Sequence, residues 1–232
     1  MTNDVQRANR TIRVGLALSL NGMIGLAAVY VMAWGYTPAE RFQGLAQKIF
    51  YIHPPAAYAS EMGFVIAGIA SLLYLFLKDF RLDTFAEASA EVGLAFALVL
   101  LTTGPMWAKP IWGAWWTWDA RLTFSLIEFL LFAGYFALRS AVRDPAERAR
   151  YAAVVAIMGM LLVPFIHLTV YLFNTTHPQP VVVKTNRPSL PGEMLRTFLT
   201  SFVVFTVMYI GFVTARYGIG ARRVALEMTD AG

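Results

Sequence analysis

Six long apolar stretches constrain this chain more than any other feature. They lie near residues 14–34, 56–77, 84–103, 122–138, 151–173 and 195–215. A helix needs about 20 mostly apolar residues to cross the roughly 30 Å hydrocarbon layer of a membrane. The sequence therefore predicts an all-α integral membrane bundle of six transmembrane helices, which form a single polytopic domain over residues 1–232.

The composition agrees with a membrane protein. The chain is 58% hydrophobic and 14% charged, whereas about a quarter of the residues in a soluble domain are charged. The first apolar stretch is too long for a signal peptide and has no small-residue cleavage site after it, so we expect it to be a span. The net charge of +5 comes from basic residues that flank the apolar stretches. We therefore expect contact with membrane lipid and no nucleic-acid partner.

Two kinds of chemistry are excluded by missing motifs. There is no cysteine, so the chain has no disulfide, no thiolate metal site and no C-x-x-C-H motif for covalent haem attachment. There is also no G-x-x-x-x-G-K-[ST] motif. The chain therefore does not hydrolyse a nucleotide through a P-loop.

The basic residues predict the orientation in the membrane. An even number of spans places both termini on one side. The N-terminus, the 78–83 turn, the 139–150 loop and the C-terminal tail lie on that side and carry twelve of the nineteen basic residues: Arg7, Arg10, Arg13, Lys78, Arg81, Arg139, Arg143, Arg148, Arg150, Arg216, Arg222 and Arg223. The side richer in Lys and Arg is usually cytoplasmic. We therefore expect both termini in the cytoplasm and three extracytoplasmic loops, near residues 35–55, 104–121 and 174–194.

The second of these loops is rich in tryptophan. The stretch "MWAKPIWGAWWTWDARLT", residues 106–123, holds five of the six tryptophans of the chain: Trp107, Trp112, Trp115, Trp116 and Trp118. On a helix, Trp112, Trp115 and Trp116 would share one face, which Asp119 would end with a carboxylate. Because Pro105 and Pro110 would interrupt the chain before it, we expect a short, separate interfacial helix. The spacing alone fits a membrane-interface anchor as well as a platform for a large planar ligand.

Histidines and cations lie in the same outer region. His53 ("YIHPP") precedes the second span and His177 ("NTTHPQP") follows the fifth, so two imidazoles could ligate a haem iron from its two faces. Lys109 and Arg121 bracket the tryptophans and could bind the haem propionates. His167 lies inside the fifth stretch, where we expect a mainly structural role.

Four carboxylates also fall within the spans, namely Glu61, Glu87, Glu91 and Glu128. Such groups are costly in lipid and face the bundle interior or water. Glu87 and Glu91 are close enough to the cytoplasmic end to snorkel. For Glu61 and Glu128 we expect hydrogen bonds between helices, with an electrostatic influence on the tryptophan platform as the alternative.

The pattern W-G-x-W-W-x-W-D, residues 112–119, resembles the tryptophan-rich signature of haem-handling proteins of cytochrome c maturation. Six spans in a short chain are most similar to the haem exporter protein C (CcmC) family. "YIHPPAA" and "PFIHLTVYLFNTTH" extend the likeness over nearly the whole chain. The departures are Pro55 after Pro54, and Pro105 and Ala108 ahead of Lys109, which put the exact geometry of the ligands in question.

The resemblance implies a function. Haem b would bind transiently at the tryptophan segment, outside the bacterial inner membrane, with His53 and His177 as axial ligands and Asp119 fixing the loop or a partner contact. The protein would deliver haem to a haem chaperone and work beside an ABC-type ATPase, its membrane subunit and a small single-span membrane protein. It would not itself be an enzyme. The alternatives are a haem lyase that acts on apocytochrome c, and a haem-free structural subunit of a transporter.

Overall fold

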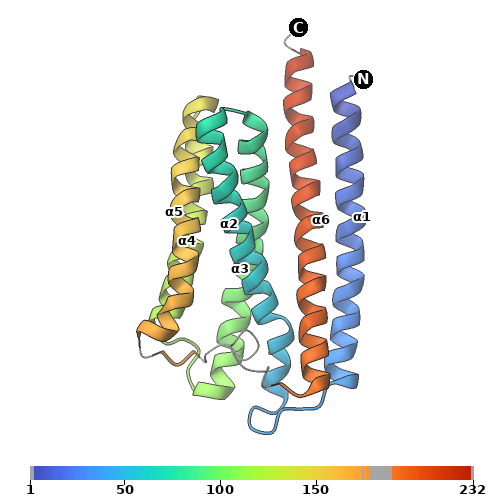
Figure 1. Cartoon of the computed structure of the whole chain (residues 1–232), viewed down its shortest axis with the longest axis vertical. Coiled ribbons are helices and arrows are strands. Elements are labelled where there is room, and N and C mark those ends of the chain that lie inside the picture. The colour runs from blue at the N-terminus through green and yellow to red at the C-terminus, as the bar shows by residue number, and fades with distance from the viewer. Residues whose placement is uncertain (1–2, 174, 178–189, 231–232) are drawn as a thin grey trace.

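The computed structural model describes residues 3–173, 175–177 and 190–230, and six long helices account for most of them (Figure 1). These are α1 (Asn3–Val31), α2 (His53–Leu77), α3 (Phe80–Trp112), α4 (Ala120–Ala141), α5 (Pro145–Leu172) and α6 (Gly192–Asp230). A π-helical turn, Met32–Tyr36, and a 3-10 helix, Leu45–Tyr51, connect α1 to α2. All six helices are long and apolar enough to cross a membrane, so the predicted all-α membrane bundle is confirmed.

The helices form two groups that stand side by side. Helices α2 to α5 make a four-helix bundle, and α1 pairs with α6 beside it (Figure 1). Both chain termini lie at one end of the molecule, which we call the termini end. The segment between α3 and α4, which holds Trp115, Trp116 and Trp118, lies at the other end, which we call the tryptophan end. The start of α2, where His53 lies, and the end of α5, which precedes His177, are also at the tryptophan end.

Small residues allow α1 and α6 to pack closely. A Cβ added to Gly15 of α1 would lie 2.3 Å from the backbone nitrogen of Ala215, and one added to Gly211 of α6 would lie 2.5 Å from the backbone nitrogen of Ser19. Real Cβ atoms do not approach backbone so closely. Membrane helices, which gain little from the hydrophobic effect between them, associate through such close contacts.

The helices extend past the predicted spans, most of all α6, whose 39 residues correspond to about 58 Å at ~1.5 Å per residue. The predicted separate tryptophan helix is wrong. Helix α3 continues through Pro105 and Pro110 as far as Trp112, since membrane helices tolerate proline. It ends because Gly113 takes a left-handed conformation, with φ +75°. Most of the predicted third loop, 174–194, lies outside the described residues.

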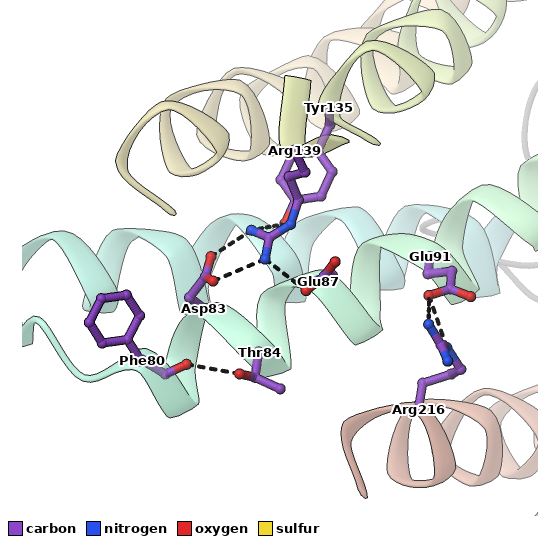
Figure 2. A network of polar contacts seen from close by, with 8 residues as sticks. All are labelled: Phe80, Asp83, Thr84, Glu87, Glu91, Tyr135, Arg139 and Arg216. Atoms are coloured by element: carbon purple, nitrogen blue, oxygen red, sulfur yellow. Dashed lines mark hydrogen bonds and ion pairs between the residues drawn. The ribbon is translucent and has the colours of Figure 1, made fainter. Parts of the chain in front are cut away.

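Ion pairs join α3 to its neighbouring helices in the half of α3 nearer the termini end, and Figure 2 shows these pairs. Arg139 of α4 donates to both carboxylate oxygens of Asp83 on α3, at 2.7 and 3.0 Å, and to Glu87 at 2.7 Å. Arg216 of α6 pairs with Glu91 of α3. Arg139 is thus a buried helix residue and not the loop cation we counted, and Glu87 and Glu91 bond neighbouring helices rather than only snorkelling. These pairs hold α3 between α4 and α6.

An aromatic layer closes the middle of the four-helix bundle. The rings of Phe64 on α2 and Phe132 on α4 stack with centroids 3.8 Å apart, and both residues are fully buried. A Cβ on Gly159 of α5 would collide with Phe132, so glycine there makes room for the stack. The layer separates the ion pairs described above from the polar groups of the tryptophan end.

Candidate functional site

The tryptophan segment leaves the helix at Gly113 and runs without regular structure to Asp119, where α4 begins. Trp115 and Trp118 are 59% and 76% exposed, and the rings of Trp116 and Trp118 meet edge to face with centroids 5.8 Å apart. The indole N–H of Trp116 is buried and has no hydrogen-bond partner among the described residues. The segment therefore presents indole surface, but not on one helix face, because residues 113–119 are not helical.

Asp119 ties this segment to the loop that carries His177. One carboxylate oxygen accepts from the backbone N–H of Leu122, at 3.0 Å, and so caps α4. The other accepts from the hydroxyl of Thr176, at 2.7 Å, and from its backbone N–H, at 3.2 Å. The hydroxyls of Thr117 and Thr176 are 3.3 Å apart. One carboxylate thus joins the second outer loop to the third, one residue from His177.

His53 is the first residue of α2 and not a loop residue, because Pro54 and Pro55 occupy the first helical turn, where proline is tolerated. Its Nδ1 lies 3.0 Å from the hydroxyl oxygen of Thr103 on α3. That hydroxyl donates to the backbone oxygen of Val99 at 2.7 Å, so it accepts a hydrogen bond from His53. The proton is therefore on Nδ1, and Nε2 carries the lone pair that a metal ion requires.

Two further contacts fix the His53 ring. Trp107 lies edge to face against it, with centroids 5.8 Å apart, and the Trp107 N–H donates to the side-chain oxygen of Gln43 at 3.0 Å. A Cβ on Gly104 would lie 3.1 Å from Cε1 of His53, so glycine lets the ring approach α3. Trp107 therefore packs inside the bundle and holds His53, apart from the exposed indoles.

His177 is near His53. The two side chains are close enough to interact electrostatically, and a turn fixes the His177 backbone, whose N–H donates to the Thr175 hydroxyl at 3.0 Å. The structure thus brings the two outer-loop histidines to the same end of the bundle, beside the tryptophan segment.

The two candidate cations differ in position. Arg121, in the first turn of α4, is partly buried and interacts electrostatically with Glu61 and Asp119. It also lies within electrostatic range of His53. Lys109 is exposed and donates to the backbone oxygen of Gly113 at 3.0 Å, which helps to close the C-terminus of α3. Arg121 is therefore the better placed of the two to bind an anionic group beside the histidines.

A second polar group lies deeper in the bundle. His167 on α5 bonds through Nε2 to Glu61 on α2, at 2.8 Å, which agrees with the interhelical hydrogen bond expected for Glu61. Glu128 on α4 is 4% exposed, and one of its carboxylate oxygens has no hydrogen-bond partner among the described residues. Buried ionisable groups at membrane depth are costly and are usually functional.

Sequence reasoning missed the residues that orient the site, namely Thr103, Gln43, Gly104 and Thr176. Each is an ordinary residue whose role depends on a partner at least 50 positions away along the chain. No local pattern of residue types marks them.

The chain is similar to known proteins over most of its length. A family model described as "Heme exporter protein C" matches residues 3–229. The chain is 35% identical to Heme exporter protein C of Bradyrhizobium diazoefficiens, an alignment that covers 98% of this chain and 89% of the relative. It is 34% identical to the protein of the same name in Haemophilus influenzae, over 84% and 78%. A putative cytochrome c biosynthesis ccmC-like mitochondrial protein of Marchantia polymorpha is 33% identical over 84% and 80%.

Proposed function

Since this chain belongs to the Heme exporter protein C family, we propose that it binds haem at the tryptophan end and delivers it to a haem chaperone for c-type cytochrome biogenesis. The observation that supports this most is the meeting of His53, His177 and the tryptophan segment at one end of a multi-pass membrane bundle. Haem b is cargo in this proposal, held transiently and passed on.

Each part of the site has a role in holding haem. His53 and His177 ligate the iron through their imidazoles, and the protonated Nδ1 of His53 leaves Nε2 for the metal. The indoles of Trp112, Trp115, Trp116 and Trp118 cover the porphyrin, and burying such rings contributes several kcal/mol at about 25 cal/mol per Å². Arg121 binds a propionate, with Lys109 as the outer alternative. Asp119 keeps the His177 loop against the tryptophan segment.

Delivery requires a site that is open on one side. Trp115 and Trp118 are well exposed, so an extracytoplasmic chaperone can reach the edge of a porphyrin that lies on them. An ABC-type ATPase, its membrane subunit and a small single-span protein complete the proposed complex, and the lack of a P-loop in this chain fits that division of labour. The protein acts by binding and delivery and not by catalysis.

The proposed orientation places the termini end in the cytoplasm and the tryptophan end outside the bacterial inner membrane. Arg7, Arg10 and Arg13 of α1 lie in the half of that helix nearer the termini end, and Arg222 and Arg223 lie near the end of α6. The exposed indoles at the other end suit the membrane–water interface. This orientation follows the rule that basic residues remain in the cytoplasm.

Purification in mild detergent tests the proposal. The protein should retain or take up haem with an absorption spectrum typical of two imidazole ligands, and His53→Ala and His177→Ala should each abolish that spectrum. Retention of haem by both variants would assign the iron ligands elsewhere. Well-folded protein that takes up no haem, yet still assembles with its transporter partners, would support the haem-free structural subunit instead.

A further inference from the structure

Three ionisable side chains lie on helices of the four-helix bundle below the haem-binding residues, Glu128 buried, Glu61 partly buried and His167 exposed. They are Glu61 on α2, Glu128 on α4 and His167 on α5. Glu61 and Glu128 each lie eight residues from the start of their helix at the tryptophan end, a depth of about 12 Å at ~1.5 Å per residue. The stacked rings of Phe64 and Phe132 close the bundle beneath them.

Among the described residues no cation forms an ion pair with Glu128. One of its oxygens is buried and has no hydrogen-bond partner there, and the carboxylate of Glu61 interacts with it electrostatically. The acidic residues of α3 all lie toward the termini end, where Arg139 and Arg216 pair with Glu87 and Glu91. An unpaired buried carboxylate costs several kcal/mol, so Glu128 holds its proton.

Glu61 has two partners that can balance its charge. His167 hydrogen-bonds to it at 2.8 Å, and Arg121 interacts with it electrostatically. The same Arg121 also interacts with Asp119 and lies within electrostatic range of His53. Arg121 thus compensates the charge of Glu61 and also interacts with the haem-binding residues.

We propose that the Glu61–His167 pair is a proton-binding site coupled to haem occupancy through Arg121. The inference rests on the proposed function, because it takes Arg121 as the group that binds a propionate. When a propionate carboxylate pairs with Arg121, the charge of Glu61 loses its compensation. The pair then takes up one proton from water, so that its net charge changes from −1 to zero. His167 lies five residues from the end of α5 at the tryptophan end, nearer that surface than Glu61, and is the member through which this proton exchanges. When haem leaves, Arg121 compensates Glu61 again and the proton is released.

The test is proton uptake during haem binding, measured with a pH indicator in weakly buffered detergent solution. Mildly alkaline pH is used, because exposed imidazoles are then already neutral and do not contribute protons. The haem is supplied already reduced and under anaerobic conditions, because ferric haem carries a hydroxide whose displacement by imidazole would itself take up a proton. The unmodified protein should take up about one proton per haem, so its haem affinity should fall by up to about tenfold per pH unit. Glu61→Gln and His167→Gln should bind haem without this uptake. Glu128→Gln, which mimics the protonated acid, should keep it.

Glu91→Gln is the matched control, since Glu91 is a span carboxylate that pairs with Arg216 far from the site; uptake should be unchanged. Haem binding without proton uptake by the unmodified protein overturns the inference and leaves the proposed function standing. Uptake that survives Glu61→Gln, or that is lost in Glu128→Gln, also overturns it. Failure of the unmodified protein to bind haem overturns the proposed function itself. The pH dependence of haem affinity in unmodified protein decides the matter if a variant fails to fold.

Discussion

Thr176→Val tests whether the Asp119 contact positions His177. The substitution keeps the shape of the side chain but removes the hydroxyl that donates to Asp119 at 2.7 Å; the backbone N–H bond at 3.2 Å remains. A hydrogen bond to a charged group contributes about 1.5–3 kcal/mol when protected from water. Thr176 is exposed, so water replaces part of the bond and we expect a loss of about 1 kcal/mol.

A loss of that size makes the loop position that can bind haem less populated, and the apparent affinity falls in proportion. We expect the dissociation constant for haem to rise by up to about fivefold, since ~1.4 kcal/mol corresponds to tenfold. It is measured by absorbance titration of the detergent-solubilised protein. The spectrum at saturating haem should stay that of two imidazole ligands, because His177 itself is intact.

Thr84→Val is the matched control. Thr84 is a partly buried threonine at the termini end whose hydroxyl donates to the backbone oxygen of Phe80 at 3.0 Å (Figure 2). Its substitution should leave haem affinity unchanged. The reasoning is refuted if Thr176→Val binds haem as tightly as the unmodified protein, or if it loses the two-imidazole spectrum even at saturation.

Three further perturbations have defined outcomes. Thr103→Val removes the acceptor for the His53 ring and should weaken haem binding about 10–100-fold. Thr102→Val should not, because the Thr102 hydroxyl bonds only the backbone of its own helix. Equal haem affinities for the two variants would contradict the assignment of the His53 proton to Nδ1. Gly15→Leu forces α1 away from Ala215 and should destabilise the protein by about 1–3 kcal/mol. Its thermal unfolding midpoint should be lower than that of the control Val14→Leu, which changes the exposed face of the same helix. Equal midpoints would exclude close α1–α6 packing. Arg139→Met leaves Asp83 buried without its cation and should destabilise by about 3–5 kcal/mol; an unchanged midpoint would show that the pair contributes little.

The sequence by itself determined the helical membrane architecture. Each apolar stretch must form a helix, because a backbone in hydrocarbon has no other way to satisfy its hydrogen bonds. An even number of spans also placed the segments around His53, Trp115 and His177 on one side. Local composition carries this information, so the six helices were predicted correctly.

The local sequence pattern gave the wrong helix boundaries where proline and glycine could each have ended a helix. The spacing of Trp112, Trp115 and Trp116 fits a helix face, and two prolines suggested a break before it. In the structure the helix comes before the break: α3 continues through Pro105 and Pro110, which a membrane helix tolerates, and it ends at Gly113. The same limit applied to Arg139, which was counted as a loop cation from its place at the edge of an apolar stretch.

Only the tertiary structure decided which polar groups meet. Asp119 reaches Thr176, Thr103 orients His53, and Glu61 bonds His167 across helices that are far apart in sequence. Hydrophobicity fixes the depth of a residue in the membrane, but it does not fix the rotation of a helix or the order of its neighbours. Those follow from close packing, as at Gly104 and His53, because contacts of a few tenths of an ångström depend on the shapes of both partners.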